Sequence, residues 1–220
     1  MPALRVLVAD DHEVVRKGLC TLLQEQPGWV VAAQARDGRE AVDKAKQLKP
    51  DIIVMDISMP GLNGLEATRQ IAKSLPQTKV LILTMHESDS LIREVLEAGA
   101  RGYLLKVDAG ADLIKAVEAL RRNQTFFTSK VSELVLDGYL KKPGKQDDGN
   151  NPSLANRLTA RQREILQLLA EGKSSKEVAV ALGLSVKTAE THRANIMSRL
   201  HCHSVSELVR YAIRNQVIQP

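Results

Sequence analysis

Five polar or charged side chains follow four of the apolar segments in the first half of the chain. Asp10 and Asp11 follow one segment and Asp56 another, while Thr84 and Lys106 end two more. Neighbouring carboxylates repel one another unless a cation neutralises them, and Mg²⁺ prefers carboxylate, carbonyl and water oxygens. A carboxylate can also attack phosphorus, a reaction that needs mainly positioning and charge neutralisation. If these side chains meet, they favour Asp56 as a phosphoryl acceptor, with positive charge from Mg²⁺ and Lys106 and a hydroxyl donor from Thr84.

The elements that must position these side chains alternate through the first 124 residues. Apolar segments without polar alternation are typical of strands buried on both faces, and they lie at residues 5–9, 30–35, 52–55, 80–84 and 102–105. Helical patterns follow them at about 13–24, 38–48, 64–74, 89–98 and 110–122. This alternation predicts an α/β fold with a doubly wound, five-stranded parallel sheet of the flavodoxin-like kind. Ligands of such sheets lie at the carboxyl ends of the strands, which is where the five side chains would meet.

Each of these residues, taken alone, has a simpler explanation. An acid such as Asp11 can cap the helix that follows it, and a lysine after a strand is usually solvated. For any single residue we favour that explanation. Five such residues at the ends of four strands, at the edge that binds ligands, favour a functional site instead.

Residues 125–157 are expected to connect this domain to a second one. A helical pattern covers about 128–140, and the stretch KKPGKQDDGNNPS follows it at 141–153. That stretch is charged, rich in Gly, Pro and Asn, and lacks any large apolar residue, as a flexible linker does. We therefore predict one domain at 1–124, a linker helix and flexible linker at 125–157, and another domain at 158–220.

The last 63 residues hold four helical patterns and no strand pattern. Thr159 and Gln162 form a capping box before the first pattern. Gly183 separates two short helices, as in a helix-turn-helix. The small all-α domain is thus expected to have four helices, at about 159–171, 175–182, 185–200 and 204–214.

The net charge of +5 is concentrated in this second domain. Residues 1–124 hold 17 basic and 17 acidic side chains, whereas residues 158–220 hold 9 and 5. A basic domain is typical of a protein that binds a polyanion, although basic faces are often only solvated.

The third helix of the second domain has two distinct faces. At about 100° per residue, Ala189, Ile196 and Leu200 face the core, with the histidine at position 192 half-buried beside them. The opposite face is small and polar, which would let the helix enter the DNA major groove. Asn195 could read adenine and Glu190 could accept from cytosine, while neighbouring basic side chains meet phosphates.

Composition excludes several other classes. Aromatic residues make up 3% of the chain, so cores must be built from Ala, Val, Ile and Leu. No apolar run approaches the ~18 residues of a membrane span, and the first residues lack a signal-peptide core. We expect a cytoplasmic protein without membrane contact. Cys20 and Cys202 suggest no disulfide framework, and the run 201–203 (His-Cys-His) makes a poor metal site because three neighbours rarely converge on one ion.

Four motifs of the first domain resemble the receiver domain of two-component response regulators. They are VLVADDHEVVRKGL, DIIVMDISMPGLNGLEATR, VLILTMHES and GARGYLLK, in that order, and the resemblance covers about residues 3–122. It implies Asp56 as the phosphoacceptor, served by a partner histidine kinase. It also implies that Mg²⁺ is bound by Asp10, Asp11, Asp56 and the Ser58 carbonyl. Thr84 and Lys106 would bind the phosphoryl group. Tyr103 would be the aromatic residue that changes rotamer on activation.

One residue departs from the receiver pattern. Met85 follows Thr84 where many receivers carry a small side chain. A long side chain there is expected to hinder a phosphodonor or attacking water, which predicts a long-lived phosphorylated form.

The stretch LTARQREILQLLAEGKSSKEVAVALGLSVKTAETHRANIMSRL resembles the LuxR-type helix-turn-helix, over about residues 157–216. With the receiver, it is typical of a NarL/FixJ-class response regulator. This resemblance implies binding of double-stranded DNA at symmetric half-sites and a homodimer formed on activation through the fourth helix. Glu190 stands where many members carry Lys, so operator preference is not transferred. The predicted DNA contacts are Ser175, Lys176, Lys187, Thr188, Glu190, Thr191, Ala194 and Asn195.

Two other functions compete with this interpretation. An aspartate-nucleophile phosphohydrolase would normally carry a second acid two residues after the nucleophile, where this chain has Ser58. A regulator that binds DNA without phosphorylation would usually lack an acid, the lysine or the phosphoacceptor, and all of these are present. We therefore expect no enzymatic activity beyond the receiver's own phosphotransfer and dephosphorylation.

Overall fold

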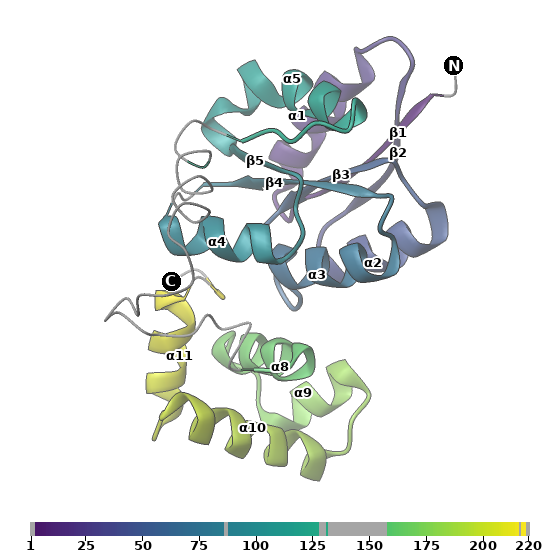
Figure 1. Cartoon of the computed structure of the whole chain (residues 1–220). Helices are drawn as coiled ribbons and strands as arrows, with labels where there is room; N and C mark the ends of the chain where they lie inside the picture. The colour runs from purple at the N-terminus through teal and green to yellow at the C-terminus, as the bar shows by residue number, and fades with distance from the viewer. Residues whose placement is uncertain (1–2, 86–87, 128–130, 132–157, 216, 219–220) are drawn as a thin grey trace.

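A computed structural model describes residues 3–85, 88–127, 131, 158–215 and 217–218 of the chain. The first part is a five-stranded parallel sheet with strand order β2-β1-β3-β4-β5. Helices α1 and α5 cover one face of the sheet, and α2, α3 and α4 cover the other (Figure 1). The strands are β1 (Leu4–Ala9), β2 (Trp29–Ala35), β3 (Ile52–Asp56), β4 (Lys79–Thr84) and β5 (Gly102–Leu105). The helices are α1 (Glu13–Gln24), α2 (Gly38–Leu48), α3 (Gly64–Ser74), α4 (Asp89–Glu97) and α5 (Ala109–Arg121).

Two apolar cores sandwich this sheet. Side chains of α2, α3 and α4 pack on one face, around Ile53 and Ile82. Side chains of α1 and α5 pack on the other face, around Val54 and Leu83. The central strands are thus buried on both sides, as their lack of polar alternation predicts, and fully burying each such side chain stabilises the fold by about 1.5–3 kcal/mol. The predicted α/β fold and its strand and helix positions are confirmed.

Three local features became known only from the structure. Strand β2 is only partly buried, because it lies at the edge of the sheet and has one strand neighbour. Asp11 does not cap α1: His12 is the N-cap residue, and no side chain caps that helix end. Lys106 begins a short 3-10 turn, Lys106–Asp108, which the sequence pattern did not reveal.

The edge beyond β5 is extended by Phe126. Its backbone pairs with Gly102, and its carbonyl accepts a hydrogen bond from the Tyr103 amide at 2.9 Å. Phe126 and Phe127 pack partly buried against the cores. The ordered structure of the first domain therefore continues past residue 124. The predicted linker helix at 128–140 and the flexible linker at 141–153 lie outside the described residues, apart from the buried helical residue Val131.

The second part is a small helical domain around its own core. The Thr159–Gln162 capping box is present, and Gly183 ends the second helix with φ of 62°. Ala189, Ile196 and Leu200 are buried, as predicted for the inner face of the third helix. The helices are α8 (Ala160–Ala170), α9 (Ser175–Leu182), α10 (Val186–Leu200) and α11 (Val205–Arg214). Helix α8 lies between the first domain and α10 (Figure 1).

Candidate functional site

The ends of four adjacent strands bring the predicted residues of the first domain together. Asp10 follows β1, Asp56 ends β3, Thr84 ends β4 and Lys106 follows β5. Because the strands are parallel, their carboxyl ends share one edge of the sheet. The pairing register places Asp56 beside Leu83, one residue before Thr84. The prediction that these side chains share one edge is therefore met.

An ammonium between two buried carboxylates forms the centre of this site. Lys106 Nζ lies 2.8 Å from Asp10 Oδ2 and 2.8 Å from Asp56 Oδ2. Asp10 is 0% exposed and Asp56 2% exposed, and the Lys106 side chain is 9% exposed. Both carboxylates thus depend on a single cation, and the group carries net negative charge away from water.

These contacts shift the pKa values of the central pair. Burial raises the pKa of Asp56 above its ordinary value, although Lys106 and the Ser58 amide favour the ionised form. Burial alone would lower the pKa of Lys106, but its hydrogen bonds to Asp10 and Asp56 outweigh this and raise it. Lys106 is therefore held as a cation, while ionised Asp56 is costly to bury.

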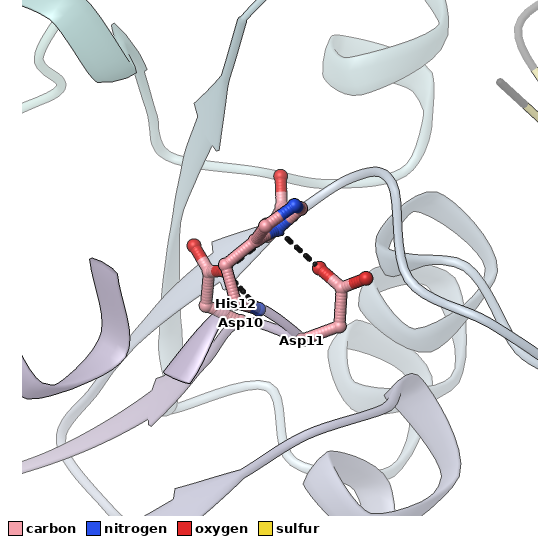
Figure 2. Close-up of side chains that lie close together, drawn as sticks. Asp10, Asp11 and His12 are labelled. Carbon is pink, nitrogen blue, oxygen red and sulfur yellow. Dashed lines mark hydrogen bonds and ion pairs between the residues drawn. The ribbon is translucent and has the colours of Figure 1, made fainter. Parts of the chain in front are cut away.

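Asp11 and His12 complete the acidic edge. His12 Nδ1 lies 2.8 Å from Asp11 Oδ1 and 3.6 Å from Asp10 Oδ1, as Figure 2 shows. The His12 amide also donates to Asp10 Oδ1 at 2.9 Å, and Arg16 Nη1 donates to the Asp10 carbonyl at 2.7 Å. Sequence reasoning did not single out His12 or Arg16. The short spacing from the paired acids was the one available signal for both.

The acidic edge has the chemistry of a Mg²⁺ site. One ligand atom from each of Asp10, Asp11, His12 and Asp56 lies within 4.8 Å of the others. Three neighbouring carboxylates, of which only Asp10 and Asp56 contact Lys106, would be relieved by a divalent cation. Hard oxygen ligands suit Mg²⁺ better than an imidazole does. Ser58, predicted to offer its carbonyl, lines a pocket together with Asp11 and His12. The residues present therefore fit Mg²⁺.

The loop from β3 to α3 passes close to the acceptor strand. The Gly64 amide donates to the Ile57 carbonyl at 2.9 Å, and a Cβ at Gly64 would lie 1.9 Å from the Asp56 carbonyl oxygen. Only glycine permits this approach of α3. Gly61, with φ of 73°, makes the turn between β3 and α3. The glycines of the PGLNG motif thus fix where the loop after Asp56 runs.

The two predicted switch residues are buried. Thr84 is 2% exposed at the end of β4, and Tyr103 is fully buried within β5. Met85 differs, with 58% of its surface exposed beside Thr84. The effect of this long side chain on the phosphorylated form stays a prediction.

The predicted DNA-contacting residues lie on α9 and α10. Ser175 is partly exposed, and the others are exposed, namely Lys176, Lys187, Thr188, Glu190, Thr191, Ala194 and Asn195. Two of their hydroxyls also stabilise the helix. Thr188 Oγ1 lies 2.8 Å from Ser185 Oγ at the N-cap, and Thr191 Oγ1 donates to the Lys187 carbonyl at 2.8 Å. Each hydroxyl keeps acceptor capacity for a ligand.

Two other sequence features have simple outcomes. His192 is half-buried as predicted, but its Nδ1 has no hydrogen-bond partner among the described residues. In the His-Cys-His run, Cys202 is buried and both histidines are exposed. The acidic edge is the one metal-type cluster found in the described part of the chain. Across that same part, no helix combines the length and the apolar surface needed to cross a bilayer.

Comparison with known proteins agrees with this geometry. The response regulator receiver domain family matches residues 6–118, and the bacterial regulatory proteins of the luxR family match residues 156–212. The oxygen regulatory protein NreC of Staphylococcus aureus (strain JH9) is 39% identical over 217 residues, which cover 98% of this chain and all of that protein. This chain belongs to the response regulators.

Solved structures of response regulators match nearly the whole chain. Response regulator ChrA of a heme-sensing two-component system is 32% identical, with 99% of this chain and 100% of that chain covered and a TM-score of 0.51. A structure of two RcsB dimers bound to two parallel DNAs is 26% identical, with 97% and 98% covered and a TM-score of 0.57. The chain is thus a NarL/FixJ-class response regulator, with a receiver and a LuxR-type helix-turn-helix output domain. Such a protein is a phosphorylation-dependent transcription regulator.

Proposed function

We propose that Asp56 accepts a phosphoryl group from a histidine kinase and that this switches dimerisation and DNA binding by the output domain. The observation that carries the proposal is the buried Asp10–Lys106–Asp56 triad, with both ion pairs at 2.8 Å. A carboxylate held this way beside a cation, at the ligand edge of a parallel sheet, suits attack on a dianionic phosphoryl group.

The transfer itself needs few groups. An ionised Asp56 oxygen attacks the phosphorus of a phosphohistidine, the P–N bond breaks, and its electron pair stays on the imidazole, leaving an aspartyl phosphate. Lys106 then pairs with the new phosphoryl oxygens, and the Thr84 hydroxyl donates to one of them. Asp10, Asp11, Asp56 and the Ser58 carbonyl would hold Mg²⁺, which supplies positive charge to the phosphoryl oxygens. The receiver's chemistry is limited to this transfer and to hydrolysis of the same acyl phosphate.

The phosphoryl group would be sensed through Thr84 and Tyr103. When the Thr84 hydroxyl moves toward the phosphoryl group, it leaves space behind it, and the buried Tyr103 ring on the neighbouring strand can take a new rotamer. This would alter the surface around α4, β5 and α5. A local change of this kind biases a two-state element.

The output domain would read promoter DNA as a dimer. Two copies of α10 would enter successive major grooves at symmetric half-sites, as the spacing of helix-turn-helix dimers requires. The DNA-bound RcsB dimers support this assembly, and α11 is the helix proposed to pair the two output domains. Lys176 and Lys187 would contact phosphates, and Glu190 and Asn195 base edges. We propose a cytoplasmic location, which the proposed kinase partner and DNA target both require.

Phosphorylation of Asp56 can be tested on the full-length protein. The protein is incubated with Mg²⁺ and acetyl phosphate, and the mass gained is located by tandem mass spectrometry. We expect one phosphoryl group on Asp56 in the wild type and none in Asp56→Asn. Phosphorylation of Asp56→Asn at the wild-type level, or none in the wild type, would refute the assignment.

A further inference from the structure

Two side chains of the output domain form hydrogen bonds with the backbone of the loop that follows the phosphoacceptor. Gln167 on α8 is 2% exposed. Its Nε2 donates to the Met59 carbonyl at 2.9 Å, and its Oε1 accepts from the Asn63 amide at 2.8 Å. Glu171, one turn further along, accepts from the Gly61 amide at 2.9 Å and from Gln167 Nε2 at 2.8 Å. Three backbone groups within five residues are therefore held from the other domain.

The loop segment held by these hydrogen bonds, residues 59–63, directly follows the proposed metal ligand Ser58 in the chain. The Ser58 carbonyl belongs to the same peptide unit as the Met59 amide, which donates to the Ile57 carbonyl at 3.1 Å. Because bond lengths and peptide planes are fixed, the Ser58 carbonyl cannot reorient without moving Met59. Gln167 therefore acts on the phosphoacceptor site through the backbone between residues 58 and 63.

Ion pairs away from this loop keep α8 docked on the receiver. Arg163 Nε lies 2.6 Å from Glu66 Oε2 on α3. Glu164 accepts from Gln70 Nε2 at 3.0 Å and lies 3.4 Å from Arg39 Nη2 on α2. Glu66 and Glu164 are buried by this contact, and buried carboxylates need such partners. The hydrogen bonds to the loop are thus part of a specific polar interface between α8 and the receiver.

The docked domain also changes the charge near the site. A pocket of ≈ 370 Å³ is lined by Asp11 and Ser58 on the receiver side and by Gln167 and Glu171 on the output side. The Glu171 carboxylate therefore adds negative charge to the wall of a pocket that already borders the acidic edge. Approach of an anion is disfavoured by this charge, independently of the hydrogen bonds to the loop.

We propose that Gln167 is a positioning residue for phosphoryl transfer, which holds the loop after Asp56 in a form that opposes entry of the phosphoryl group. This inference rests on the proposed function and adds a partner within the chain: α8 of the output domain. Coupling between two sites is reciprocal, so a phosphoryl group at Asp56 weakens docking of α8 by the same factor. The switch would then work by release of α8 from the receiver. It would not work by uncovering the proposed DNA-contacting residues of α10, because these are already exposed in the docked form.

The test compares beryllofluoride binding, with Mg²⁺ present, in three full-length proteins by isothermal titration calorimetry. Gln167→Met keeps about the size of the side chain and adds no charge, but it removes the donor to the Met59 carbonyl and the acceptor for the Asn63 amide. Gln77→Met is the matched control, because Gln77 is exposed near the start of β4, at the opposite edge of the sheet. We expect beryllofluoride to bind about 5- to 20-fold tighter to Gln167→Met, within the range of known couplings, and unchanged to Gln77→Met.

A second measurement reports on the loop without any metal or anion. Amide hydrogen exchange of Gly61 and Asn63 should be faster in Gln167→Met than in the wild type, since the Asn63 amide loses its acceptor and Glu171, the acceptor for Gly61, loses its hydrogen bond from residue 167. The exchange of β3 amides should stay unchanged, which shows that the receiver remains folded.

The outcomes separate the two proposals. Faster exchange at Gly61 and Asn63 with beryllofluoride affinity unchanged, or weaker than wild type, would overturn the positioning role while leaving Asp56 as the acceptor. Unchanged exchange would show that the hydrogen bonds between residue 167 and the loop are absent in solution, and this would also overturn the positioning role. If the wild type and Gln167→Met both fail to bind beryllofluoride, the proposed function itself is wrong.

Discussion

In the receiver, the side chains proposed to carry the chemistry are buried and converge on one ammonium, whereas those proposed to contact DNA are exposed along one helix. Asp10 and Asp56 lie at 0% and 2% exposure around Lys106. On α10, the residues from Lys187 to Asn195 that are proposed to contact DNA are all exposed. Burial makes each charge of the receiver depend on its neighbours, while DNA recognition is spread over groups that act nearly independently. A single substitution in the receiver site should therefore cause a large loss of phosphorylation rate. A single substitution on α10 should cause only a partial loss of DNA affinity.

The steepest response should follow loss of the shared cation. In Lys106→Met, two buried carboxylates face each other alone, and the developing phosphoryl charge loses its ammonium. We expect the rate of phosphorylation by acetyl phosphate to fall about 10²- to 10³-fold, as for removal of one preorganised electrostatic contact. Lys115→Met is the control, because Lys115 is exposed on α5 and pairs only with Asp112 among the described contacts. A rate within threefold of wild type would show that the two carboxylates do not depend on Lys106.

A base-reading contact should give a moderate effect. Asn195→Ala is expected to cost about 1–3 kcal/mol of affinity for the preferred operator and to relax the choice of base at one position. Binding is measured by fluorescence anisotropy with the beryllofluoride form, at one stated salt concentration. Equal losses for specific and random DNA would instead mark Asn195 as a contact to the backbone.

A phosphate contact should behave differently from Asn195. Lys187→Ala is expected to weaken binding to all sequences alike and to lower the slope of log K against log salt concentration by about 1. Salt titrations of the wild type and variant on specific and random DNA provide the measurement. An unchanged slope would remove Lys187 from the DNA interface.

Neutralising the acceptor should have a smaller effect, on stability. Burial raises the pKa of Asp56, so its ionised form destabilises the fold at neutral pH. Asp56→Asn should therefore melt at a higher temperature than the wild type at pH 7. Because the wild-type penalty disappears as pH falls through the raised pKa, the difference should shrink as the pH is lowered from 7. Mg²⁺ should raise the melting temperature of the wild type more than that of the variant. A lower melting temperature for Asp56→Asn at pH 7 would contradict the burial argument.

The smallest effect is expected at the rim of the site. Met85→Ala should shorten the half-life of the aspartyl phosphate a few-fold, because water gains access beside Thr84. The half-life is followed by loss of the phosphorylated band on phosphate-affinity gels. A half-life equal to that of the wild type would mean that the Met85 side chain does not cover the acyl phosphate.

Much of the receiver follows from local sequence. Apolar segments ending in Asp10, Asp56 and Thr84 predict parallel strands, and parallel strands put those ends at one edge. What sequence could not supply was the depth of burial and the sharing of Lys106 between two acids. The exposure of β2 depends on strand order, which no local pattern encodes.

The contact between the domains is the clearest case of information absent from sequence. Gln167 lies in α8 and Glu171 is the C-cap residue of that helix, whose apolar pattern is explained by its own core. Their partners are backbone groups of a distant loop, which carry no side-chain signal. The Thr159–Gln162 capping box and the Gly183 turn could be predicted because each depends on residues a few positions apart.

Sedimentation of the full-length protein, with and without Mg²⁺ plus beryllofluoride, tests the central claim most directly. Beryllofluoride on Asp56 mimics the aspartyl phosphate. The account predicts a monomer that becomes a dimer in the wild type and shows no change in Asp56→Ala. An unchanged mass in the wild type, or the same shift in Asp56→Ala, would contradict a dimerisation switch controlled from Asp56.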